Sequence, residues 1–232
     1  MGKAPAALRL ISGVGAKGPA CFVVEVAGRR LMLDCGEGPP PGYLPDVDDL
    51  SAVDALVLSH GHRDHVGGLS LLAKLGNPPV YATEIVGRGL PKGLAVRPLP
   101  VHGTTDILGI AVETGRNGHA PGGIWLHFAI GDGLIYTGDF CAESALYAYD
   151  PPAKSAATLL MDCSYASYDK PLADCWDKLA SFLGRDDAVA TPIVADSFAA
   201  LRGTGLTGDA ALAFVRRDVV TRSRAWLRRD NK

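Results

Sequence analysis

The sequence predicts an α/β domain, because segments with strand character alternate with segments of helical spacing along the chain. Residues 54–59 form a short apolar run, typical of a buried strand, that ends directly at His60. In residues 67–75 the leucines recur at helical spacing. A glycine and aspartate turn at residues 131–133 separates two apolar runs, which indicates a hairpin. The histidines that begin at His60 are therefore expected on a loop between a strand and a helix.

The remaining elements were assigned from apolar runs, turn residues and helical spacing. Strands are expected at residues 8–11, 21–26, 30–34, 54–59, 80–82, 94–99, 124–130, 134–137 and 157–161. Helices are expected at residues 67–75, 84–90, 171–183 and 209–229. The proline- and glycine-rich residues 38–45 predict an irregular loop. This order of elements favours a mixed fold over an all-α or all-β domain.

Composition limits the class of protein. The 232 residues are 47% hydrophobic and 21% charged, an ordinary globular balance. No apolar run approaches the roughly 20 residues that a membrane span needs, and residues 1–11 lack the apolar core of a secretory signal. We therefore expect a cytoplasmic protein with no membrane partner. The net charge of −2 indicates no general affinity for nucleic acid, and nothing in the sequence indicates the oligomeric state.

The cysteines predict neither a disulfide framework nor a thiolate zinc site. They are five in number, scattered, and never form a C-x-x-C pair. Buried free thiols are the simpler expectation for them.

The most informative segment is residues 59–68. It places His60, His62, Asp64 and His65 within six positions. Imidazole and carboxylate groups are ligands of zinc, and histidines two apart on an extended loop can share one ion at about 2.0–2.1 Å. Asp64 and His65 would turn toward a second ion. The alternative is a charged loop without metal, but gathering four such ligands without an ion would cost folding free energy that no metal binding offsets.

The H-x-H-x-D-H run resembles the signature of metallo-β-lactamase-fold hydrolases, and its companions follow in the order of that family. Residues 33–36 (LDCG) resemble the early aspartate motif, residues 118–122 (GHAPG) the third-motif histidine, and residues 136–140 (YTGDF) the bridging-aspartate motif. Residues 160–165 (LMDCSY) resemble the acidic motif that opens the beta-CASP insertion of RNA 3′-end-processing and RNase J nucleases.

This resemblance spans roughly residues 8–185 and implies an αββα sandwich, two β-sheets packed face to face with helices outside and the metals at one edge. It implies a catalytic domain at residues 1–185 and a divergent, helical tail at residues 186–232. The family continues with a long insertion and further histidines, whereas this chain has no histidine after His127. A truncated or frame-shifted end is therefore an open alternative for the tail.

The resemblance also implies the ligands of two zinc ions. The first ion would be held by three histidines, His60, His62 and His119. The second would be held by Asp64 and His65, and Asp139 would bridge the two. A water between the ions would be the nucleophile, with Asp64 orienting it, so Asp64 and Asp139 are the candidate catalytic residues. Because the second ion lacks a further histidine, we expect one tightly held Zn²⁺ and a weaker second ion, for which Mn²⁺ is an alternative.

Other polar residues leave two interpretations open. Asp34 could orient the ligand loop or simply end a strand and cap a turn. Asp162 and Tyr165 could belong to the acidic motif or to an ordinary strand end. Arg63 could meet a substrate phosphate or be a solvated cation. Cys141 could reach a metal, but a small buried side chain is the simpler expectation.

Two histidines and the basic tail are expected to lie outside the site. His102 is predicted to be an ordinary surface or core residue, and His127 lies in a strand whose alternation decides its face. Residues 202–232 carry eight Lys or Arg against three Asp, which favours a solvated helix face over a polyanion-binding face.

For function, the motifs favour hydrolysis of a phosphodiester in RNA or DNA, with single-stranded nucleic acid as the candidate partner. The first alternative is a small-molecule ester, thioester or lactone hydrolase, since the same metal pair serves those substrates. The second alternative is an incomplete, non-catalytic metal-binding protein, which the missing late histidines motivate.

Overall fold

The computed structural model describes residues 6–144 and 147–163, and farther along the chain residues 171, 174, 197, 200–201, 204, 210, 213–215, 217–219 and 221–222. The chain divides into two units, Met1–Ala166 and Ser167–Lys232. All the elements bounded below belong to the first unit.

The first sheet has six strands in the order β1-β2-β3-β4-β5-β6. Their bounds are β1 (Ala6–Ser12), β2 (Cys21–Val26), β3 (Arg29–Leu33), β4 (Ala55–Val57), β5 (Val80–Thr83) and β6 (Val96–Leu99). Strands β1 to β3 are antiparallel, and β3 to β6 are parallel. Parallel neighbours end at the same edge of a sheet, so the residues that follow β3 and β4 come close together.

The second sheet has five strands in the order β11-β10-β9-β8-β7. Their bounds are β7 (Gly103–Ile107), β8 (Ile110–Arg116), β9 (Ile124–Phe128), β10 (Leu134–Tyr136) and β11 (Thr158–Leu160). Only the pair β10 and β11 is parallel. Strands β7 and β8 were not predicted as separate strands. Strand β7 (GTTDI) has only one apolar residue, at its end, and thus lacks the apolar run typical of a strand.

The structure corrects the predicted helix at residues 67–75. Helix α1 (Arg63–Val66) begins earlier, and the 3-10 helix η1 (Leu69–Ala73) follows after an interruption. The chain between them pairs instead with the segment after β3: Cys35 N donates to His65 O at 2.9 Å and Gly68 N donates to Cys35 O at 2.8 Å. These bonds occupy groups that a continuous helix would need for itself. The predicted helix at 84–90 is α2 (Glu84–Gly89).

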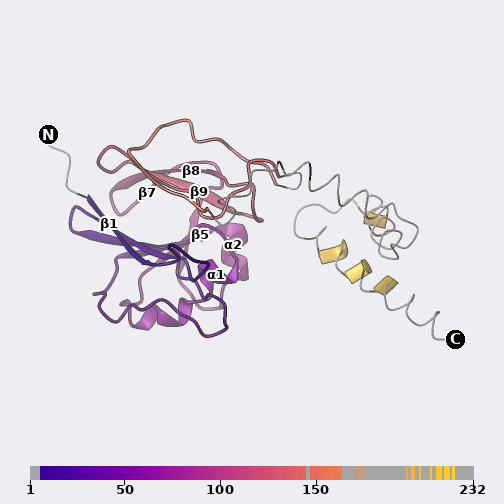
Figure 1. The fold of residues 1–232 in the computed structure, drawn as a ribbon, viewed down its shortest axis with the longest axis horizontal. Coiled ribbons are helices and arrows are strands. Elements are labelled where there is room, and N and C mark those ends of the chain that lie inside the picture. Colours follow the sequence, from indigo (N-terminus) through magenta and orange to yellow (C-terminus); the bar gives the residue numbers. More distant parts are fainter. Residues whose placement is uncertain are drawn as a thin grey trace. The chain divides into compact units, whose positions relative to one another are not determined.

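Two hydrophobic cores give the unit its layers. The face of β2 that carries Phe22 and Val24 belongs to the core between the two sheets, where Leu126 and Phe128 of β9 also lie. The opposite face, with Cys21 and Val23, belongs to a core shared with η1 and α2. Figure 1 shows β7, β8 and β9 facing the first sheet. The predicted α/β class with two packed sheets is thus confirmed.

The second unit is described at scattered positions, of which residues 210, 213–215, 217–219 and 221–222 are helical within the predicted helix 209–229. The rest of that helix and of the basic tail, most of the predicted helix 171–183, and the predicted boundary after residue 185 lie outside the described residues. These remain predictions. No helix in the described part of the chain has the length and apolar character needed to cross a membrane.

Candidate metal centre

The candidate ligands meet where strands of both sheets end. His60 lies three residues beyond the end of β4, and helix α1 carries Asp64 and His65. From the second sheet, His119 follows β8 and Asp139 follows β10. Ile124 N at the start of β9 donates to Ser59 O at 2.9 Å, which joins the two sheets at this edge. The topology therefore brings together residues that are far apart in the sequence.

The first group of candidate ligands consists of three histidines and one carboxylate, His60, His62, His119 and Asp139. Nδ1 of His62 lies 3.1 Å from Nε2 of His60 and 3.0 Å from Nε2 of His119. Ligand atoms bound at about 2.0–2.1 Å to one tetrahedral ion lie roughly 3.3 Å apart. The ring nitrogens thus have the separation that a shared zinc ion requires.

The second group consists of Asp64, His65 and Asp139. Nε2 of His65 lies 3.0 Å from Oδ1 of Asp139 and 4.0 Å from Oδ2 of Asp64. The other oxygen of Asp139, Oδ2, lies 3.6 Å from Nε2 of His119 in the first group. Asp139 therefore presents one oxygen to each group, which is the arrangement that a bridging carboxylate needs.

Asp34 lies behind this centre and orients it. Its carboxylate is completely buried. It accepts hydrogen bonds from Ser59 N at 2.7 Å and Ser59 Oγ at 2.6 Å, and from the hydroxyl of Tyr136. Nδ1 of His65 lies 2.7 Å from its Oδ2. Of the two interpretations of Asp34, the structure favours the orienting one, since a buried carboxylate with these partners holds the ligand ring in place.

Gly138 allows the two sheets to approach at this edge. Its φ is +54°, and a Cβ added there would lie 2.6 Å from Oγ of Ser59. No side chain fits at that distance. The glycine next to Asp139 is thus required for the close approach of Ser59.

The surroundings shift the pKa values of His60 and His65 in opposite directions. Burial, with a contribution from His65, lowers the pKa of His60 well below its usual range. A neutral imidazole keeps a lone pair free for a metal. Burial also lowers the pKa of His65, but Asp34 and Asp139 outweigh it and raise that pKa to about 10. An ion at Nε2 of His65 would therefore displace a proton.

Several predicted or alternative residues lie apart from the two groups. Arg63 is paired with Glu37, with its Nε 2.9 Å from Oε2. His102 is exposed, and its Nδ1 lies 3.1 Å from Oδ2 of Asp150. His127 is buried on the face of β9 away from the core between the sheets. Cys141 is half-buried and belongs to neither group.

The expectation of buried thiols holds for Cys21 and Cys35 and is wrong for Cys163, which is exposed. Cys163 follows β11 at the rim of a cavity, where the strand has left the core. Cys175 and Tyr165 lie outside the described residues.

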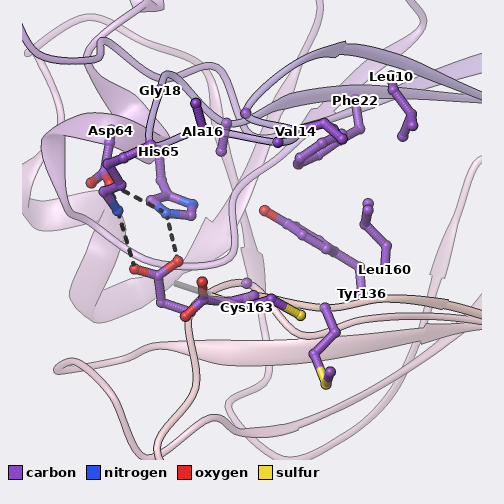
Figure 2. A pocket seen from close by; sticks show the side chains of 18 residues that line it. Leu10, Val14, Ala16, Gly18, Phe22, Asp64, His65, Tyr136, Leu160 and Cys163 are labelled. Atoms are coloured by element: carbon purple, nitrogen blue, oxygen red, sulfur yellow. Dashed lines mark ion pairs between the residues drawn. The ribbon is translucent and has the colours of Figure 1, made fainter. Parts of the chain in front are cut away.

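A cavity of about 610 Å³ opens beside the second group. Figure 2 shows Asp64 and His65 at one end of it and Leu10, Phe22 and Leu160 at the other. Asp162 also lines the cavity.

Sequence reasoning missed Lys17, which forms an ion pair with Asp64 within this cavity. The only signal was a single lysine in the glycine-rich residues 12–20 between two predicted strands. Such a loop has no periodicity from which the direction of a side chain follows.

Comparison with known proteins agrees with this geometry. The family model described as the metallo-beta-lactamase superfamily matches residues 14–182. The transcription termination factor FttA of Methanosarcina mazei is 29% identical over 196 residues, which cover 68% of this chain and 31% of that protein. Ribonuclease TTHA0252 of Thermus thermophilus is 31% identical over 174 residues, 61% of this chain and 39% of the relative. Ribonuclease J 1 of Streptococcus pyogenes is 29% identical over 153 residues, which cover 56% of this chain and 27% of that protein. The chain thus spans about a third of the length of these relatives.

Proposed function

The chain belongs to the metallo-beta-lactamase superfamily, and on that premise we propose that it is a zinc-dependent hydrolase that cleaves phosphodiesters in RNA or DNA. The observation that carries the proposal is Asp139, whose two oxygens face the two groups of candidate ligands separately. The names of two similar relatives, both ribonucleases, support a nucleic-acid substrate.

In this proposal His60, His62 and His119 would hold the first ion, Asp64 and His65 would hold the second, and Asp139 would contribute to both sites. Two zinc ions held this close would supply a nucleophilic water near neutral pH and offset charge on the attacked phosphoryl group. Mn²⁺ is an alternative occupant of the second group.

The residues of the chain position the reaction. Asp64 lies at the end of the cavity, where its carboxylate can accept a hydrogen bond from the attacking water and orient it. Asp34 holds the ring of His65 in one orientation, and the buried hydroxyl of Tyr136 in turn holds Asp34. Asp64 and Asp139 are the proposed catalytic residues.

The proposed partner is single-stranded nucleic acid. Binding would come from local cations and from the metal centre, because the net charge of −2 supplies no general attraction. Binding should therefore weaken with salt along a shallow slope.

The test is a comparison of three substrates with the zinc-loaded chain: bis-p-nitrophenyl phosphate, labelled single-stranded RNA and p-nitrophenyl acetate. We expect turnover of the phosphodiesters to exceed turnover of the acetate, and removal of metal to abolish it. Faster cleavage of the acetate would overturn the choice of substrate. No turnover of any substrate would favour a non-catalytic metal-binding protein.

One feature of the cavity favours the small-molecule alternative. Leu10, Val14 and Met161 line it and are 51%, 58% and 44% exposed. An apolar wall beside a metal centre would suit the acyl part of an ester, thioester or lactone. Hydrolysis of a hexanoyl thioester faster than of RNA would select this alternative.

A further inference from the structure

Lys17 brings a positive charge to the ligands of the second group. Its Nζ forms an ion pair with Asp64 and lies 4.0 Å from Oδ2 of Asp139. Among the described residues that line the cavity, no other is a lysine or arginine. Two of the three groups that would hold the second ion are therefore also partners of an ammonium group.

The backbone of the loop holds Lys17 in this place. Ala20 N donates to the backbone oxygen of Asp64 at 2.8 Å, so the loop is anchored on the residue that Lys17 contacts. Ser12 Oγ donates to Pro19 O at 2.6 Å and closes the base of the loop. Gly13 has a φ of +81°, which lets the chain turn back toward the cavity.

We propose that Lys17 competes with the second ion, chiefly for Asp64, and so widens the difference in affinity between the two metal sites that their ligand numbers create. This inference rests on the metal centre of the proposed function. A lysine is charged at neutral pH, since its ordinary pKa is about 10.4. A divalent ion at the second group must therefore break the ion pair with Asp64 and move the ammonium away against electrostatic repulsion.

The first group meets Lys17 only through the longer of its two contacts, at Oδ2 of Asp139. Its ligands are three imidazoles and Asp139, and Lys17 lies nearer to Asp64 than to this shared carboxylate. An imidazole ligand forms no ion pair with an ammonium group, so a metal that binds it displaces none. Occupancy of the first site is therefore expected to depend much less on Lys17 than occupancy of the second site, and this contrast distinguishes competition from a general effect on the fold.

A purely structural role for Lys17 predicts something different. Its side chain is 54% exposed, and an ion pair this accessible contributes little to stability. Neutral substitution should therefore leave the fold intact. If the ion pair mainly supported the position of Asp64, its loss would loosen the second site, whereas competition predicts that its loss tightens it.

The experiment measures both zinc equivalents by chelator competition in the full chain, for the wild type, Lys17→Met, Lys17→Gln and Lys17→Arg. Lys74→Met is the matched control, because Lys74 also pairs with an aspartate, Asp48, but does not line the cavity. We expect both neutral variants to bind the second equivalent at least about tenfold more tightly, with a much smaller change in the affinity of the first equivalent. Lys17→Arg should keep the weak second site, and Lys74→Met should match the wild type.

An unchanged or weaker second equivalent in both neutral variants would overturn the inference, as would an equal gain in Lys74→Met. If the first equivalent binds normally and the affinity of the second does not respond to substitution of Lys17, this inference is wrong and the proposed function is unaffected. Absence of both equivalents in every variant would remove the metal centre and the proposed function together. The affinity of the first equivalent also reports whether each variant is folded.

Discussion

Nδ1 of His65 lies 2.7 Å from Oδ2 of the buried Asp34, and this contact directs the opposite ring nitrogen, Nε2, to within 3.0 Å of Oδ1 of Asp139. Asp34 reaches His65 across 31 positions of sequence, and Tyr136, which hydrogen-bonds to Asp34, is 102 positions away. The orientation of one candidate ligand therefore depends on contacts from both sheets.

Asp34→Asn should weaken the second metal equivalent by about 10- to 100-fold, because the amide cannot hold His65 as the carboxylate does. The first equivalent should change less. Zinc titration against a chelator measures both. Asp54→Asn is the control, since Asp54 accepts a hydrogen bond from Arg30 N at 2.8 Å away from the centre. Equal second-site affinities in wild type and Asp34→Asn would contradict this role.

His62→Ala and Asp139→Ala should each lower hydrolysis of the preferred substrate by at least about a hundredfold, because each removes a proposed ligand that positions the nucleophile. His102→Ala, which alters an exposed histidine outside both groups, should change the rate little. Initial rates at saturating zinc test this. Wild-type turnover by His62→Ala in metal-depleted buffer would contradict the zinc mechanism.

Extensive dialysis should leave about one zinc per chain, because the first group offers four ligands and the second offers three among the described residues. Metal analysis by mass spectrometry gives the stoichiometry. Adding Zn²⁺ or Mn²⁺ should then raise activity. Two equivalents that resist chelation would mean that a further residue completes the second site.

Gly138→Ala should destabilise the fold by about 1–3 kcal/mol more than Gly131→Ala. Both glycines have a φ of +54°, but a Cβ at Gly138 would meet Ser59 whereas one at Gly131 meets nothing within 4 Å. The backbone strain therefore cancels between the two variants, and the difference reports the close approach. Urea unfolding of both variants measures it, and equal destabilisation would count against the steric argument.

Arg116→Met should reduce stability at neutral pH and less so in acid. The hydrogen bond from Arg116 holds the pKa of Asp150 below its usual range. A carboxyl whose pKa is lower in the folded state contributes stability that is present above its unfolded pKa, about 3.9, and is lost as the pH falls through the folded value. The difference in melting temperature between wild type and variant should thus be constant above about pH 5 and shrink as the pH falls from there toward about 2. A difference independent of pH would contradict this account.

The sequence by itself determined the α/β class, most strand positions and the proximity of His60, His62, Asp64 and His65. These features depend on alternation, turn residues and spacing within a few positions, which act locally. The resemblance of short motifs to one family added His119 and Asp139 to the same set, and the structure places both beside the loop, although their role as ligands stays a prediction.

Only the tertiary structure decided the interruption between α1 and η1, the partners of Asp34 and the position of Lys17. Each depends on which distant backbone groups meet when the two sheets pack. Leucine spacing indicates a helix at residues 67–75, but Gly68 N donates to Cys35 O, and only Leu69–Ala73 is helical, as a 3-10 helix. Lys17 lies in a loop without periodicity, so its pairing with Asp64 follows from the anchoring of Ala20 and not from any pattern along the chain.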